Sequence, residues 1–400
     1  MFIVTLAALL IPILIARFQV SSVPTAVAAI LVGIVIGKTG LNLVHPDSTL
    51  KLMSTLGVIM LLFLSGMSIN FDLFKRHSKD QQKDGNKASP VMLAVQAFSV
   101  IVGSAVLLSL LLKVGHVFTG VFLSVIIFST IALGVVIGTL REQQVLDHPY
   151  GQALLLTAVL GQVIPMLALT FYASINGGNA KKLWLLVFLF IAAIILLRRF
   201  KKYFPWFKAN TKATTQLDVR LAFFLMFTLV TIATKVGAEN ILGAFLAGMV
   251  MKLLEPEATT QQKLASIGYG FLIPYFFIMT GAKLNLRELW NNPRAIILIL
   301  LLTLCFVLVK LPTVLIYRQC FSQRSAWAGS FLNITTITLV LPILQVAQNL
   351  HAINNVQVAA FTLAAVLACI IGPVGFNLLF KELKKSKWSN CRHNRLMIRF

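Results

Sequence analysis

Acidic residues are scarce in this chain, which has 12 Asp and Glu against 35 Lys and Arg in 400 residues. Charged residues together make up only 12% of the sequence, whereas hydrophobic residues make up 58%. One soluble core cannot hide so many apolar side chains. The composition therefore excludes an ordinary soluble domain and predicts a protein of the lipid bilayer.

Recognisable catalytic and metal-binding patterns are also missing. The four cysteines have no CxxC or other metal-ligand spacing, which favours a packing role. No nucleophile with a base at familiar spacing and no phosphate-binding glycine loop occurs, so we expect neither an enzyme nor a cofactor. Basic residues separate apolar runs instead of gathering on one folded surface, which excludes a nucleic-acid partner.

Long apolar runs follow one another along nearly the whole chain. Runs of roughly 17 to 25 mostly apolar residues are long enough to cross a bilayer as helices. The sequence therefore predicts an all-α, polytopic membrane protein with about thirteen spans by this length criterion. The expected spans are 2–17, 23–42, 51–70, 90–113, 117–140, 151–175, 182–198, 218–235, 238–253, 265–282, 293–318, 325–348 and 356–381.

Basic residues are distributed unequally between the two sides of these spans. Of the 35 Lys and Arg, 25 lie in one set of alternate loops and the C-terminal tail, and nine lie in the opposite loops. Because Lys and Arg are retained on the cytoplasmic side, this asymmetry predicts an outer N-terminus and a cytoplasmic C-terminus in the plasma membrane. The remaining basic residue, Lys310, lies within an apolar span.

The sequence indicates one transmembrane domain over residues 1–400 with an internal repeat. The pentapeptides STIAL, from Ser129, and TTITL, from Thr335, match at three of five positions half a chain apart. Six spans on each side of the seventh would make the copies inverted, which is typical of secondary transporters. We expect repeats over about 1–175 and 218–381, a basic linker over 198–217 and a cytoplasmic tail over 382–400.

Hydroxyl-rich segments in both halves are candidates for unwound helix. Such segments at mid-membrane favour interruptions that line a cavity, although Ser and Thr also pack or bond to their own helix. Pro342 follows the second segment and cannot donate a helical hydrogen bond. The predicted ion-lining residues are Ser129, Thr130, Asn333, Thr335 and Thr336.

Lys310 is the other indication of a functional site. An ammonium group within a span costs roughly 2.5 to 3.5 kcal/mol on insertion scales, so such residues usually have a function. The alternative is that the side chain reaches the interface. Arg318 is eight positions away, roughly 12 Å along a helix, so Lys310 is well inside the expected span.

Four motifs resemble those of the monovalent cation:proton antiporters, in particular the Kef-type and NapA-type branch. They occur in the family's order over nearly the whole membrane region. They are LGV at 56–58 with LLFLSG at 61–66, FSTIA at 128–132, LGAFLAG at 242–248 and GFLIPYFFIMTG at 270–281.

The resemblance implies two discontinuous helices that cross at Ser129–Thr130 and Thr335–Thr336. The family's paired ion-binding positions, whose second member is normally acidic, fall on Gly161 and Gln162. Lys310 matches the basic residue that members carry on a partner helix. None of the 12 acidic residues and none of the six histidines lies mid-span, so the usual buried carboxylate relay is absent.

We therefore expect a secondary transporter that exchanges Na⁺ or K⁺, and by the same chemistry Li⁺, for protons. Gln162 would offer a neutral oxygen to the cation, and Lys310 would carry the proton because desolvation favours its neutral form. Such exchange is electroneutral and requires one bundle of helices to move against the other. The resemblance also implies a homodimer.

Two alternatives to exchange are a transport-impaired or regulatory homologue, because Gln162 replaces the acid, and a passive ion channel. Lys310 makes the site electropositive, although nothing resembles a selectivity ring.

Overall fold

A computed structural model describes residues 1–17, 24–45, 47–68, 90–146, 148–176, 216–235, 240–284 and 293–385. Within these ranges the regular structure is helical throughout, which confirms the predicted fold class. Nine helical segments there are long and apolar enough to cross a membrane, and α1 (Phe2–Arg17), α2 (Thr25–Ile36) and α11 (Asn240–Leu253) are shorter apolar helices. The expected span 182–198, nearly all of the linker 198–217 and most of the tail 382–400 lie outside the described residues.

The helices form two compact units, and each unit combines early and late parts of the chain. Unit 1 contains α1, α2, α3 (Ser48–Met67), α10 (Leu217–Lys235), α11, α12 (Ala258–Ile267), the π-helix η1 (Gly268–Leu272) and α13 (Ile273–Lys283). Unit 2 contains α5 (Pro90–Val114), α6 (Val121–Ser129), α7 (Leu133–Glu142), α8 (Pro149–Asn176) up to Leu169, α15 (Pro293–Lys310), α16 (Thr313–Tyr317), α17 (Gln323–Asn333), α18 (Ile337–Asn349) and α19 (Asn355–Lys385). The inverted repeat over 1–175 and 218–381 stays a prediction.

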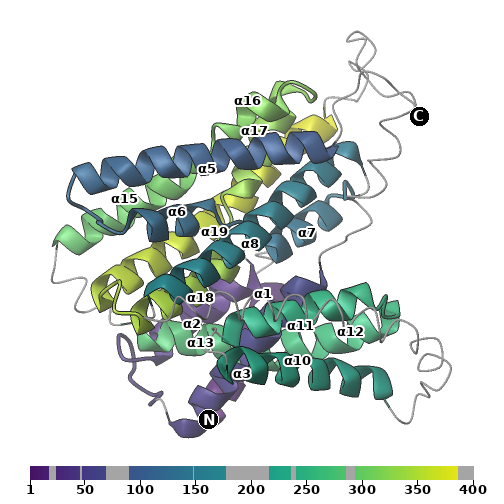
Figure 1. Ribbon diagram of the computed structural model, residues 1–400, viewed down its shortest axis with the longest axis vertical. Helices are drawn as coiled ribbons and strands as arrows, with labels where there is room; N and C mark the ends of the chain where they lie inside the picture. The colour runs from purple at the N-terminus through teal and green to yellow at the C-terminus, as the bar shows by residue number, and fades with distance from the viewer. Residues whose placement is uncertain are drawn as a thin grey trace. The chain divides into compact units, whose positions relative to one another are not determined.

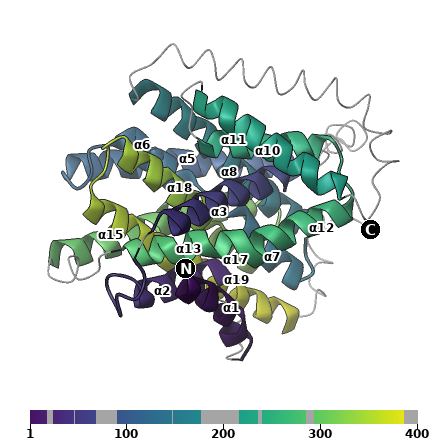
Figure 2. The same ribbon diagram turned by 90° about the horizontal axis from the view of Figure 1, so that it is seen from below.

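Small residues let α11 approach its neighbours in unit 1. Figure 2 shows α11 beside α3 and α10, and these pairs are in contact. A Cβ at Gly243 would lie 2.6 Å from the carbonyl oxygen of Leu229, and one at Gly248 would overlap the carbonyl oxygen of Phe63. The LGAFLAG motif therefore serves helix packing.

Three spans in unit 1 differ from those expected by three residues or more at one end or both. The helix expected over 23–42 ends at Ile36. The helix expected from 51 begins at Ser48, because Asp47 caps it by accepting a hydrogen bond from the N–H of Leu50 at 2.6 Å. The helix expected over 265–282 extends over 258–283. It widens to a π-turn over Gly268–Leu272 just before Pro274, a residue that cannot donate to the preceding turn.

Unit 2 contains two pairs of half-helices, α6 with α7 and α17 with α18. α5 runs beside α15 and α16, and α17 packs against α19 (Figure 1). The span expected over 293–318 is confirmed as Ala295–Tyr317, but its helix is interrupted, because α15 ends at Lys310 and α16 begins at Thr313. Pro312 removes a backbone donor there, and the hydroxyl of Thr313 donates to the carbonyl of Lys310 at 2.7 Å. Lys310 is therefore the last residue of a helix rather than a mid-helix residue.

Candidate functional site

Two helices of unit 2 are interrupted at the predicted positions. The first stops at Ser129 and resumes at Leu133, and the second stops at Asn333 and resumes at Ile337. Thr130 has an extended backbone, with φ −67° and ψ 145°, so the helical hydrogen bonds cannot continue through it. The predicted discontinuous helices are thus present in the structure.

The interrupted segments bond to each other and to α8. The N–H of Ala132 donates to the carbonyl of Thr335 at 2.7 Å, which joins the two crossing segments directly. The N–H of Ile131 donates to the carbonyl of Gly161 on α8 at 3.0 Å. Backbone groups released by unwinding therefore find partners inside the protein, as a membrane interior requires. Sequence reasoning did not identify Ala132 or this pairing.

Four predicted hydroxyl groups are buried at the crossing, but they do not all face each other. The hydroxyls of Thr130 and Thr336 form a short hydrogen bond across the two segments. Ser129 instead donates to the carbonyl of Ile126 at 3.0 Å, and Thr335 donates to that of Leu332 at 2.9 Å. Thr130 also donates to the carbonyl of Ile127 on its own helix at 2.7 Å, so the bond across the crossing takes the proton of Thr336. Thr130 and Thr336 are therefore the hydroxyl pair of the crossing, whereas the hydroxyls of Ser129 and Thr335 bond to their own helices alone within the described residues.

Lys310 extends to the ends of both interrupted helices. Its buried Nζ donates to the carbonyl of Thr130 at 2.5 Å and makes a longer contact of 3.4 Å to that of Asn333. Carbonyls at helix C-termini carry partial negative charge, which suits an amine donor. No carboxylate in the described ranges lies within ion-pair distance of Nζ. The amine is buried beside dipoles rather than beside an acid.

Gln162 is buried on α8, and neither its Oε1 nor its Nε2 has a hydrogen-bond partner among the described residues. The structure therefore does not bond this predicted site residue to Thr130, Thr336 or Lys310. Its neighbour Gly161 accepts the bond from Ile131, and a Cβ there would lie 2.6 Å from the Ile131 side chain. α8 thus approaches the first interruption closely at the position preceding Gln162.

Two groups missed by sequence reasoning, Tyr317 and Thr157, continue the polar site. Asn333 donates from Nδ2 to the hydroxyl of Tyr317 at 3.0 Å, and Tyr317 donates to Thr157 at 3.0 Å. All three side chains are buried. The available signal was that Tyr317 lies seven residues after Lys310 within the same expected span. Two thiols also contact or pack in this unit: Cys369 accepts from the N–H of Ile337 at 3.4 Å, and Cys305 is buried.

The crossing thus combines neutral oxygen atoms with one amine. Oε1 of Gln162, Oδ1 of Asn333 and Oγ1 of Thr338 are buried in unit 2 without hydrogen-bond partners in the described part of the chain. Hydroxyl and carbonyl oxygens are suitable ligands for hard monovalent cations. Neutral oxygens of this kind suit a dehydrated monovalent cation, and an amine such as that of Lys310 can take up and release a proton.

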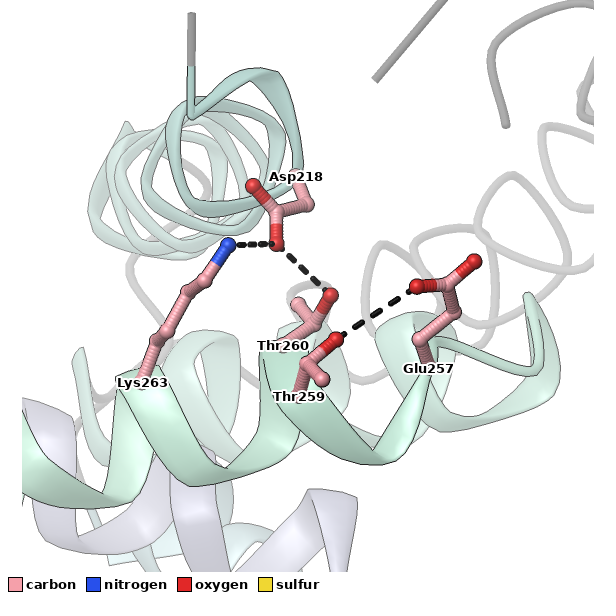
Figure 3. Close-up of polar contacts among 5 residues, drawn as sticks. All are labelled: Asp218, Glu257, Thr259, Thr260 and Lys263. Atoms are coloured by element: carbon pink, nitrogen blue, oxygen red, sulfur yellow. Dashed lines mark hydrogen bonds and ion pairs between the residues drawn. The ribbon is translucent and has the colours of Figure 1, made fainter. Parts of the chain in front are cut away.

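A buried carboxylate does occur in unit 1, outside this crossing. Figure 3 shows Asp218 accepting hydrogen bonds from Thr260 at 2.7 Å and from Lys263 at 3.1 Å. The acid belongs to the first turn of α10, where a negative charge suits the helix dipole, and its partners lie on α12. The contacts join two helices of unit 1, which is a structural role.

Several known proteins are similar to this chain over most of its length. A family model described as "Sodium/hydrogen exchanger, transmembrane" matches residues 5–382. YjbQ of Bacillus subtilis, provisionally named an Na⁺/H⁺ antiporter, is 40% identical over 95% of this chain. The chain spans 62% of the length of that protein. An Na⁺/H⁺ antiporter of Enterococcus hirae is 24% identical, with 92% of this chain and 94% of that protein covered.

The fold also resembles a solved structure, that of the sodium proton antiporter MjNhaP1 from Methanocaldococcus jannaschii. The TM-score is 0.59 at 14% sequence identity, and the match covers 96% of this chain and 97% of the other. At this identity the likeness concerns the arrangement of helices and not the residues of the site.

Proposed function

Because the chain belongs to the sodium/hydrogen exchanger family, a family of monovalent cation:proton antiporters, we propose that it exchanges Na⁺ or K⁺ for protons across a membrane. The observation that carries the proposal is the meeting of two interrupted helices beside the buried amine of Lys310. Such interruptions expose backbone carbonyls and helix ends to a transported ion. Exposed carbonyls and helix ends around a buried amine favour ion transport as the function.

Neutral oxygens bind the cation in this proposal. Thr130 and Thr336 supply hydroxyls at the crossing, and Gln162 supplies the amide oxygen that has no partner within the described residues. An acidic residue at position 162 would bind a cation more strongly, so we expect weak affinity and fast release. Thr335 and Ser129 act through the backbone shape of the interruptions, since their hydroxyls bond to their own helices.

Lys310 carries the proton. A neutral amine has two N–H groups, and Nζ has two carbonyl acceptors, those of Thr130 and Asn333. Protonation would add a third N–H and a positive charge with no carboxylate near it in the described ranges. A cation and a protonated Lys310 therefore repel each other, so that one leaves when the other enters. One charge replaces one charge, and exchange is electroneutral.

Cation-dependent proton flux in everted vesicles tests the proposal. The parent protein should dissipate a pH gradient when Na⁺ or K⁺ is added, and the ions that act, Li⁺ included, define its selectivity. Gln162→Glu should bind the cation more tightly, without exceeding the parent's maximal flux. Gln261→Glu, the same change on α12 of unit 1, should behave like the parent. A silent parent that becomes active only as Gln162→Glu would instead identify a transport-impaired homologue.

The orientation and assembly complete the proposal. The excess of Lys and Arg in one set of loops supports an outer N-terminus and a cytoplasmic C-terminus in the plasma membrane. A homodimer is part of the same proposal and rests on the family resemblance. Crosslinking in native membranes would test the dimer, and thiol labelling of Cys320 would test the orientation.

A further inference from the structure

A directed chain of hydrogen bonds links α8, α16 and the end of α17. Nδ2 of Asn333 donates to the hydroxyl of Tyr317 at 3.0 Å. That hydroxyl donates to Oγ1 of Thr157 at 3.0 Å, and Thr157 donates to the carbonyl of Ala153 at 2.8 Å. Asn333, Tyr317 and Thr157 are all fully buried, so water does not compete with these bonds.

The direction of the chain follows from its last member. The carbonyl of Ala153 can only accept a hydrogen bond, so Thr157 donates its single hydroxyl proton to that carbonyl. The hydroxyl oxygen of Thr157 must then accept a hydrogen bond from Tyr317, which uses the only hydroxyl proton of Tyr317. Tyr317 can offer Asn333 only a lone pair. The amide of Asn333 must therefore present its NH₂ group to Tyr317, because the reversed amide would place oxygen against oxygen.

The opposite end of the same amide has no partner. Oδ1 of Asn333 is buried and accepts no hydrogen bond among the described residues. Asn333 is the last residue of α17, next to the interruption, and its own backbone carbonyl receives the contact from Lys310. A buried amide oxygen without a donor is costly unless something occupies it. A monovalent cation bound to Oδ1 would satisfy this unpaired oxygen.

From this arrangement we infer that Oδ1 of Asn333 is a ligand of the transported cation, and that Tyr317 is the positioning residue that turns the oxygen toward it. The inference rests on the proposed exchange and adds a specific ligand to it. Thr157 acts on Asn333 indirectly, because it bonds to Tyr317 and not to Asn333. Its role is to take the tyrosine proton, which would otherwise be donated to Oδ1 in a reversed amide.

Four variants test this role. Tyr317→Phe frees the amide to rotate, and Thr157→Val lets Tyr317 donate to Oδ1; each should raise the KM for the cation by about two- to tenfold, the value of one buried hydrogen bond, with kcat little changed. Thr157→Ser keeps the hydroxyl and should restore the parental KM. The double variant Tyr317→Phe/Thr157→Val should be no worse than Tyr317→Phe, because both changes act through one chain.

The matched control is Thr313→Val. This change removes a buried hydroxyl of α16 that bonds to Ser330 and to the backbone carbonyl of Lys310, both at 2.7 Å. It leaves the bonds of the Asn333 side chain and of the Lys310 amine intact. It should lower thermal stability without raising the KM. If Tyr317 served packing alone, Tyr317→Phe would behave like Thr313→Val, and an unchanged cation KM in Tyr317→Phe would overturn the inference.

Binding measured without transport separates this inference from the proposed function. Stabilisation of the detergent-solubilised protein by Na⁺ or K⁺ reports the Kd directly, because a ligand of the folded state raises the melting temperature. A parent that binds cation but does not exchange protons would refute the proposed function, and the weaker binding of Tyr317→Phe would still support the ligand. A parent that exchanges, with the same Kd in Tyr317→Phe, would refute the ligand alone.

Discussion

Replacing Lys310 tests the proton carrier directly. Lys310→Met keeps a long unbranched side chain and removes the amine, whereas Lys310→Arg keeps N–H donors and a charge that is never released in proteins. Both variants should lose proton coupling. Only Lys310→Met should also lose the hydrogen bonds to the two helix ends, so the pair separates proton chemistry from support of the backbone.

The structure sets the expected cost for stability. The bond from Nζ to the carbonyl of Thr130, at 2.5 Å, leaves a buried acceptor unsatisfied when it is removed, which costs about 1–3 kcal/mol. The 3.4 Å contact to Asn333 is long for an N–H···O bond and adds little. Methionine offsets this loss, since burying a polar group costs about 1–3 kcal/mol in proteins. Lys310→Met should therefore remain folded.

Flux in proteoliposomes with a trapped pH dye measures the outcome. The parent should show cation-driven proton movement that varies with pH, and Lys310→Met and Lys310→Arg should match empty liposomes. Lys263→Met is the control, because Lys263 pairs with Asp218 in unit 1 and takes no part in the crossing. Retained pH-dependent exchange in folded Lys310→Met or Lys310→Arg would refute a lysine proton carrier.

Three further outcomes follow from the packing. Gly161→Ala should lower stability by about 1–3 kcal/mol and slow transport, since its Cβ would overlap Ile131; parental melting and flux would contradict that contact. Asp218→Asn should lower stability by at most about 1 kcal/mol, because its lysine partner is 37% exposed, and should leave the KM unchanged in flux assays. Cys320 is exposed between α16 and α17, and an impermeant maleimide should label it in everted vesicles and not in intact cells. Partial desolvation by its neighbours raises the pKa of the exposed Cys320 thiol, so its labelling rate should keep rising at pH values where an ordinary thiol is already ionised.

Much of the fold was predictable because a bilayer admits few kinds of spanning structure, of which the α-helix is one. Apolar runs of sufficient length predict helices, and hydroxyl clusters at Ser129–Thr130 and Thr335–Thr336 predicted the two interruptions that the structure contains. Boundaries were less predictable where one residue decides them. Asp47 extends α3 by capping it, and Pro312 interrupts the helix inside the span Ala295–Tyr317, which hydropathy alone does not reveal.

The candidate site was predictable in its members and not in its contacts. Lys310 was identified by the cost of placing an amine within a span, a property of the residue and its neighbours in sequence. Its acceptors, the carbonyls of Thr130 and Asn333, lie at the ends of other helices, 180 and 23 residues away in the chain. Tyr317 gave no sequence signal beyond its spacing, because a tyrosine in an apolar helix is ordinary until a donor and an acceptor are found beside its hydroxyl.

The sequence by itself determined that this chain is helical, lies in a membrane, has interrupted helices in both halves and lacks a mid-span acid, since each property depends on local composition and spacing. Only the tertiary structure decided which polar groups meet, that Ser129 and Thr335 bond to their own helices, and that Asn333 and Gln162 keep unpartnered oxygens in the described part of unit 2. A hydrogen bond forms or fails with changes of tenths of an ångström between donor and acceptor. When these groups are far apart in the sequence, only the packing of the folded chain sets their distance.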